Sequence, residues 1–131
     1  MKSPSFPKAV PEIPVSDIDK AQTYYRDCLG FHIEWNDTEG GGIGGISRGE
    51  CRMFLTNAMF REGYGNAAPV LVWINLDSKQ EVDELHEAWK ASGARIVSPV
   101  ESKPWKLREF TVSDLDGNLF RVFYDFRGDP E

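Results

Sequence analysis

Hydrophobic residues recur along this chain at two spacings, one typical of helices and the other typical of strands. The first helical stretch lies between Ser16, a candidate N-terminal cap, and Gly30, a glycine that can end a helix. The second follows a capping box formed by Ser78 and Glu81 and ends at Gly93. The residues at helical spacing are Ile18, Ala21, Tyr25 and Cys28 in the first stretch, and Val82, Leu85 and Trp89 in the second. We therefore expect one helix in each half of the chain.

Alternating or densely apolar segments predict strands around both helices. We expect these strands over residues 8–15, 31–35, 46–47, 51–56, 70–76, 95–99, 108–113 and 119–126. Each half then has the order β-α-β-β-β, a faint internal repeat. The pattern predicts an α+β fold in a single domain, residues 1–131, with modules at about 8–57 and 69–126. One helix covers only one face of a sheet, so the sister module, a partner chain or a ligand must bury the other face.

Composition and charge narrow the function classes. The 131 residues include 15 basic and 21 acidic side chains, a net charge of −6, which argues against a nucleic-acid binder because that function needs a basic surface. No apolar run approaches the length of a membrane span, and the start of the chain lacks a signal-peptide core. Cys28 and Cys51 are too few for a disulfide framework. We expect a cytoplasmic protein with reduced thiols.

A glycine-rich stretch over residues 36–45 matches a nucleotide-binding pattern only in its letters. Gly40, Gly42 and Gly45 fit the expression G-x-G-x-x-G. We expect no helix directly after them, so no helix N-terminus would hold a pyrophosphate. The stretch is therefore interpreted as a flexible loop, and nucleotide binding is not expected.

The most specific motif lies near the end of the chain, where turn residues separate two expected strands. Its residues are Asp114, Asp116, Gly117, Asn118 and Phe120, in the pattern D-x-D-G-N-x-F. This motif resembles the last hairpin of the glyoxalase/bleomycin-resistance/extradiol-dioxygenase superfamily, which has the vicinal-oxygen-chelate fold. The Pro-Trp pair at 104–105, followed by Arg-Glu-Phe at 108–110, is similar more narrowly to the bleomycin-resistance branch.

The resemblance implies two βαβββ modules that form a cupped mixed sheet, and a homodimer that exchanges its N-terminal strand. Metalloenzymes of the superfamily bind a divalent metal with one side chain from each of four strands on the cupped face. The positions that match here are Val10, Phe54, Leu71 and Arg121. None of these is a usual metal ligand, so we expect no metal and no other cofactor.

No catalytic group is predicted. His32 and His86 are the only histidines, and both are interpreted as exposed surface residues outside any triad. Arg52 can lower the pKa of the neighbouring Cys51 thiol, but a structural thiol is the expected role.

In bleomycin-resistance proteins a flat drug lies in a crevice between two protomers and stacks on aromatic residues. Strand alternation puts Trp73 and Arg121 on the cupped face of the expected sheet. The residues that resemble such a crevice are Trp35, Thr56, Asn66, Trp73 and Trp105, with Glu34 as an acidic neighbour and Arg121 as a cation. The alternative for the three tryptophans is an ordinary role in the core or in a dimer interface.

These expectations favour a metal-free binding protein of the bleomycin-resistance type, a homodimer that sequesters an aromatic or cationic small molecule in antibiotic resistance. Arg121 would oppose a cation unless it is paired, and can equally recruit an anionic ligand. Two alternatives stay open. One is a metal-dependent lyase or dioxygenase of the same superfamily with an atypical site, and the other is a related binding protein for another metabolite.

Overall fold

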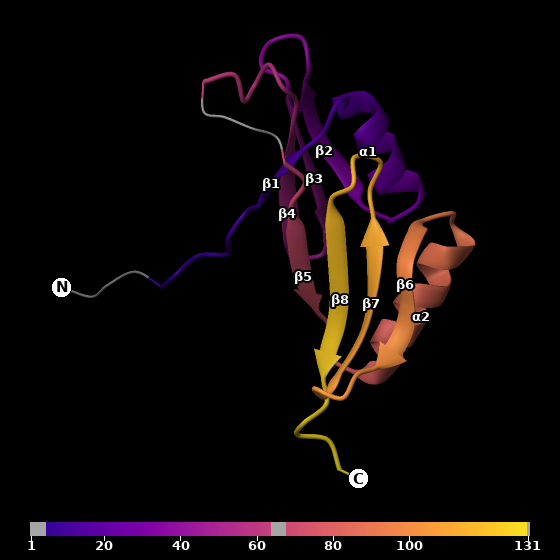
Figure 1. Ribbon diagram of the computed structural model, residues 1–131. Coiled ribbons are helices and arrows are strands. Elements are labelled where there is room, and N and C mark those ends of the chain that lie inside the picture. The colour runs from indigo at the N-terminus through magenta and orange to yellow at the C-terminus, as the bar shows by residue number, and fades with distance from the viewer. Residues whose placement is uncertain (1–4, 64–67, 131) are drawn as a thin grey trace, which may run out of the picture.

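The computed structural model describes residues 5–63 and 68–130 (Figure 1). Within these ranges it contains two helices, α1 (Ile18–Asp27) and α2 (Lys79–Ala91). The strands are β1 (Glu12–Pro14), β2 (His32–Asp37), β3 (Ile43–Arg48), β4 (Cys51–Thr56), β5 (Leu71–Asn75), β6 (Arg95–Ser102), β7 (Leu107–Ser113) and β8 (Leu119–Asp125).

The strands form two four-stranded mixed sheets of the same topology. Sheet A has the order β1-β4-β3-β2, and sheet B has the order β5-β8-β7-β6. The β1–β4 and β5–β8 pairs are parallel, and the other pairs are antiparallel. Helix α1 packs on sheet A and helix α2 packs on sheet B (Figure 1). This confirms the predicted α+β fold of two βαβββ modules, and it leaves one face of each sheet, called the open face, without a helix.

The internal repeat extends to irregularities in the strands. In sheet A the pairing of β2 with β3 shifts between Ile33 and Trp35, and in sheet B the pairing of β6 with β7 shifts between Ile96 and Ser98. Each bulge lies in the first strand after the helix of its module, and the extra residue turns the next side chain to the other face. Ile33 pairs with the buried Ile46, whereas Trp35 lies on the open face. The simple alternation expected over residues 31–35 is therefore wrong.

The glycine-rich stretch is a loop only in part, because residues 38–42 form the turn between β2 and β3 while the two ends of the stretch belong to those strands. Strand β3 begins at Ile43, and Gly44 and Gly45 lie inside it. A Cβ at Gly45 would come within 2.7 Å of Nε1 of Trp35, so glycine lets the indole lie against the strand. A Cβ at Gly44 would come within 2.6 Å of Nε2 of Gln22. These two glycines serve close packing rather than phosphate binding.

The helix caps agree with the prediction in one module and differ in the other. Asp17, not Ser16, caps α1, because its Oδ1 accepts a 3.0 Å hydrogen bond from an amide in the first turn. The amide of Ser16 donates instead to Oδ1 of Asp116 in the last hairpin, at 3.0 Å. The predicted cap of α2 is confirmed, since Oγ of Ser78 accepts a 3.1 Å hydrogen bond from the amide of Glu81. The Glu81 carboxylate accepts in return from the amide of Asp77, one residue before the cap, at 2.8 Å.

His86 is buried, so the prediction of an exposed histidine is wrong. It is 6% exposed, and its ring centroid lies 5.1 Å from that of Phe110 on β7. It shares the inner face of α2 with Val82 and Trp89, so the buried stripe is wider than the apolar residues alone indicate. Among the described residues, Nε2 of His86 has no hydrogen-bond partner. His32, in contrast, is exposed as predicted.

The D-x-D-G-N motif joins the two modules. The buried carboxylate of Asp114 accepts a 2.7 Å hydrogen bond from Oη of Tyr25 in α1. The same carboxylate accepts 2.9 Å hydrogen bonds from the amides of Asp116 and Asn118, which close the turn. Asn118 then donates through Nδ2 to the carbonyl oxygen of Pro14 in β1, at 2.8 Å. A motif that the sequence presented as turn chemistry thus also holds sheet B against sheet A.

Tyr25 lies at the centre of this junction. Its ring packs edge-on against Phe31 and Phe120, with centroid distances of 5.7 and 5.8 Å. Burial raises the pKa of Tyr25 well above its ordinary value, and the Asp114 carboxylate raises it further. The phenol is therefore held in its neutral, donating form.

Candidate functional site

The open face of sheet A carries a transverse row of paired residues. The strand register puts Glu12 opposite Phe54, Phe54 opposite Gly45, and Gly45 opposite Trp35. The rings of Trp35 and Phe54 are in contact, with centroids 5.4 Å apart. Trp35 is 36% exposed, so the row presents an aromatic surface to solvent.

The predicted acidic neighbour of Trp35 is already paired within the chain. Nε of Arg52 lies 2.9 Å from Oε1 of Glu34, and Cζ of Arg52 lies 5.0 Å from the ring centroid of Phe54. This pair brings the predicted Glu34 next to the aromatic surface. It also offsets much of the negative charge that Glu34 would present to a ligand.

Thr56, another predicted site residue, lies at the end of β4 and is fully buried. Its Oγ1 donates to Oε2 of Glu12 at 3.1 Å and accepts from Nη1 of Arg61 at 2.9 Å. The hydroxyl is therefore engaged within the chain, and it orients the carboxylate of Glu12 on the open face. The predicted Asn66 lies outside the described residues.

Sheet B repeats the row at the equivalent strands. The strand register puts Trp73 opposite Arg121, Arg121 opposite Thr111, and Thr111 opposite Ser98. Cζ of Arg121 lies 4.8 Å from the ring centroid of Trp73, and Nε lies 3.4 Å from Oγ1 of Thr111. Two predicted site residues therefore meet as a cation–π pair, while the indole of Trp73 stays 46% exposed.

Trp105 joins this row from the turn between β6 and β7. Its indole is 52% exposed, and Nε1 donates a 3.4 Å hydrogen bond to Oε2 of Glu109. In the described part of the chain, Lys106 is the one residue other than glycine with a positive φ, 71°. That conformation costs about 1–3 kcal/mol and persists only where other contacts hold it. One such contact is the 3.0 Å hydrogen bond from Nη2 of Arg127 to the carbonyl oxygen of Trp105.

A hollow of about 210 Å³ lies between Trp105 and Arg121. Its polar lining consists of Ser98, Lys103, Glu109, Thr111 and Arg121. Ligand pockets usually enclose about 300–1,000 Å³, so this hollow needs a second surface to enclose a drug-sized molecule.

Two charged residues of this hollow, Lys103 and Glu109, were not predicted as site residues from the sequence. Glu109 is the more unusual of the two. It is 6% exposed, an uncommon degree of burial for a carboxylate. The signal was present, because Glu109 lies two positions before Thr111 and therefore on the same face of β7. The sequence prediction did not include Glu109, because residues were assigned to that face only from the positions matched to metal ligands, and β7 contains none of those.

Strand pairing corrects the positions matched to the metal ligands of the superfamily. The two rows pass through Glu12, Phe54, Trp73 and Arg121. Val10 precedes β1, and Leu71 lies two residue pairs before Trp73, so the strand pairing places Glu12 and Trp73, rather than Val10 and Leu71, beside Phe54 and Arg121. Of the four, only Glu12 offers an oxygen ligand. The described residues also contain no group of three His, Cys, Asp or Glu that could hold a metal ion. This donor set does not fit a divalent metal.

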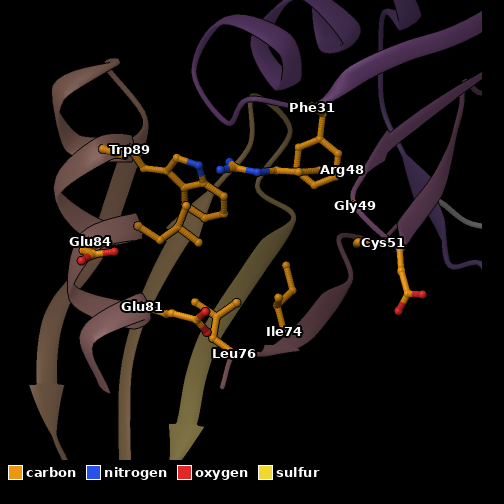
Figure 2. A pocket seen from close by; sticks show the side chains of 12 residues that line it. Phe31, Arg48, Gly49, Cys51, Ile74, Leu76, Glu81, Glu84 and Trp89 are labelled. Atoms are coloured by element: carbon orange, nitrogen blue, oxygen red, sulfur yellow. The ribbon is translucent and has the colours of Figure 1, made fainter. Parts of the chain in front are cut away.

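A cavity of about 650 Å³ lies between α2, β5 and the turn that joins β3 to β4 (Figure 2). Its walls are mainly apolar, and three of its charged side chains already form hydrogen bonds or ion pairs within the protein. Nη1 of Arg48 donates to the carbonyl oxygen of Leu29 at 2.6 Å. Glu81 belongs to the capping box of α2, and Glu50 pairs with Lys8 at 2.7 Å. The open face of sheet B, where exposed aromatic and charged groups converge, is therefore the better candidate site.

Cys51 lines the cavity of Figure 2, but its thiol is not made more reactive there. Burial raises the pKa of the Cys51 thiol, so the lowering that Arg52 could have caused does not occur. Burial also raises the pKa of Cys28, and both cysteines are free thiols. The structural role expected for Cys51 agrees with this.

The sequence profile of the Glyoxalase/Bleomycin resistance protein/Dioxygenase superfamily matches residues 9–122. The chain belongs to this superfamily. Its two modules have the vicinal-oxygen-chelate arrangement that the resemblance implied. No curated protein sequence matches the chain significantly.

Solved structures of superfamily members share the fold. A glyoxalase/bleomycin resistance protein/dioxygenase from Nocardioides has a TM-score of 0.77 and 22% identity, covering 96% of this chain and 88% of its own. The bleomycin-binding protein of Streptomyces verticillus, complexed with copper(II)-bleomycin, has a TM-score of 0.69 and 26% identity over 92% of this chain and 97% of its own. Lactoylglutathione lyase from Agrobacterium tumefaciens has a TM-score of 0.72 and 19% identity, covering 93% of this chain and 98% of its own. A binding protein and a lyase both have this superfamily fold, so the function must be argued from the site.

Neither helix in the described part of the chain has the length and apolar character needed to cross a membrane.

Proposed function

We propose that this superfamily member binds a small aromatic molecule in two crevices between the protomers of a homodimer. The observation that supports the proposal is the exposed indole of Trp105, which lines the hollow of sheet B, together with the exposed indole of Trp73, which contacts Arg121 of the same hollow. Exposed aromatic groups gathered on a face without helix cover are typical of an interaction surface. The hydrogen bonds of the turn and of the Trp105 indole support a stacking role, because a side chain held in place loses little freedom when a ligand binds.

The chemistry of the open faces supports binding over catalysis. Glu12 is the single oxygen donor among the four matched positions, and Arg121 is a permanent cation. A metal-dependent lyase or dioxygenase would need more ligands than this set supplies. His86 packs between α2 and Phe110 of β7, on the helix-covered side of sheet B, and does not offer a general base to the hollow.

The size of the hollow supports a homodimer. If the open face of sheet A of one protomer covers sheet B of its partner, Trp35 provides the second aromatic wall of a closed crevice. Glu34 and Thr56 then lie at its rim, Thr56 acting through Glu12, and Asn66 is proposed as a further polar contact. The symmetry of a homodimer produces two such crevices.

The N-terminal segment supports an exchanged strand between the protomers. Residues 5–10 are exposed and run away from the body of the protein (Figure 1). Phe6 in this segment is fully exposed, although aromatic side chains are rarely left in water without a partner. We propose that this segment contacts the partner protomer. We also propose a cytoplasmic location, where both thiols stay reduced, and a role in antibiotic resistance if the ligand is a drug.

A thermal-shift panel of bleomycin-class drugs, aromatic metabolites and divalent metals tests the proposal, with sedimentation velocity run alongside. We expect a dimer and an aromatic compound that raises the melting temperature, because a ligand at 100 times its Kd stabilises the folded state by about 2.7 kcal/mol. Calorimetry should then give two sites per dimer. A monomer that binds no aromatic compound, or stabilisation by a divalent metal together with metal-dependent turnover, would contradict the proposal.

A further inference from the structure

We infer that the ligand is a planar aromatic acid, whose anionic group is received by Arg121 beside Lys103. The inference rests on the proposed function above and adds the charge of the ligand. The sequence left that charge open between a cation and an anion.

Each of the exposed indoles, Trp73 and Trp105, already has a positively charged side chain of the protein over its ring. Cζ of Arg121 lies 4.8 Å from the ring centroid of Trp73, and Nζ of Lys103 lies 5.8 Å from the ring centroid of Trp105. A cationic group of a ligand stacked on either indole would therefore approach a like charge at short range. The two tryptophans favour a neutral or anionic ring system instead.

Arg121 has donors to spare. A guanidinium has five N–H donors, and one of them, on Nε, has a hydrogen bond in the structure, the 3.4 Å contact with Oγ1 of Thr111. No carboxylate among residues 5–63 and 68–130 forms an ion pair with Arg121. Its planar fork matches a carboxylate in a bidentate manner, and stacking on Trp73 holds the fork beside the hollow.

The charge of the hollow is opposite in sign to the net charge of the whole chain. Its charged lining consists of two cations, Lys103 and Arg121, and one carboxylate, Glu109, whereas the chain has a net charge of −6. Lys103 also pairs with Glu101 at 3.3 Å, so Arg121 is the principal anion-binding group.

Glu109 does not remove this positive character. It is 6% exposed, and its Oε2 accepts the hydrogen bond from Nε1 of Trp105. Its carboxylate thus lies at the N–H edge of the indole, where it helps to position Trp105. Because this carboxylate is buried and already accepts a hydrogen bond within the chain, Arg121 remains the group of the hollow that best receives an anion.

Three probes with one ring system test the inference: naphthoate, naphthamide and naphthylmethylammonium. Calorimetric titration of each into the full-length protein at low ionic strength should show naphthoate bound about tenfold or more tightly than the other two, a difference of about 1.4 kcal/mol. The preference should shrink at high salt, because screening weakens the ionic contact. Equal binding of all three would overturn the inference while leaving the proposed function intact. No binding by any of them would count against both.

Arg121→Gln should abolish the preference for naphthoate and leave naphthamide binding within about twofold. Arg121→Lys should keep part of the preference, because the charge remains while the planar fork is lost. Arg95→Gln, which removes an equal charge from an exposed position of β6 outside the hollow, is the matched control and should keep the full preference. If Arg121→Gln folds, as judged by circular dichroism, and still prefers naphthoate, Arg121 is not the anion-binding group.

Discussion

The phenol of Tyr25 donates a 2.7 Å hydrogen bond to Oδ2 of Asp114, which lies 89 residues further along the chain. The donor belongs to the helix of the first module and the acceptor to the last hairpin of the second. Asp114 also accepts the amides that shape its own turn. One buried carboxylate therefore combines the turn chemistry of the superfamily motif with the contact between the modules.

Replacing Asp114 with Ala should lower the free energy of unfolding by about 2–4 kcal/mol, because several buried donors lose their acceptor at once. Urea-induced unfolding followed by circular dichroism measures this change. Asp27→Ala is the matched control, since Asp27 is exposed and, within residues 5–63 and 68–130, forms an ion pair with its neighbour Arg26 alone, at 2.8 Å. The control should change stability by less than about 0.5 kcal/mol, and an equal effect of both substitutions would contradict a structural role for the Asp114 network.

Stability should depend on alkaline pH through Tyr25. Burial, and then the Asp114 carboxylate, raise the pKa of Tyr25 well above its ordinary value, so the folded state keeps the phenol proton longer than the unfolded state does. The contribution is fully present below about pH 10, the pKa of an unfolded tyrosine, and is lost as the pH rises toward the pKa of the folded state. Melting temperatures measured between about pH 8 and pH 11 should fall less steeply for Tyr25→Phe than for the native chain. Parallel curves for the two proteins would exclude this linkage.

Trp105→Ala should weaken binding of the best ligand from the panel by about 1–3 kcal/mol, the range found when a stacking aromatic side chain is removed. Isothermal titration measures the loss. Leu115→Ala is the control, because Leu115 is also exposed and apolar but lies on the turn between β7 and β8, outside the hollow. Unchanged affinity in a folded Trp105→Ala protein would remove this indole from the site.

Mixing two defective variants tests whether each crevice uses both protomers. Trp35→Ala and Trp105→Ala homodimers should each bind weakly, because every crevice lacks one aromatic wall. After the two proteins are unfolded and refolded together, about half of the dimers should be mixed, each with one intact crevice, so about a quarter of all crevices should regain native affinity. Titration of the refolded mixture measures that fraction. Absence of recovery in a mixture that contains heterodimers would mean that both tryptophans of a crevice come from the same protomer.

Much of the fold followed from local patterns. The stripe of α2 and its capping box lie within a few turns of chain, so spacing and cap chemistry were enough to predict them. The same reasoning erred at His86, because residue type alone assigned a histidine to solvent, whereas packing against Phe110 on β7 buries it. It also erred at Ser16, where the neighbouring Asp17 takes the cap and the Ser16 amide bonds to Asp116.

The candidate site depended more on tertiary structure than the fold did. The sequence singled out Trp73, Trp105 and Arg121, and the structure brings all three to one open face. The sequence did not indicate that the Thr56 hydroxyl would form hydrogen bonds with Glu12 and Arg61, because those partners lie outside β4.

The sequence by itself determined the order of helices and strands, the superfamily and the aromatic character of the candidate site. Those properties rest on residue identity and short spacings. Only the tertiary structure decided that a bulge turns Trp35 to the open face, that Gly45 makes room for its ring, and that the buried Glu109 accepts the hydrogen bond of Trp105. Register, bulges and cross-strand contacts arise from pairing between distant segments, and spacing within one segment does not encode them.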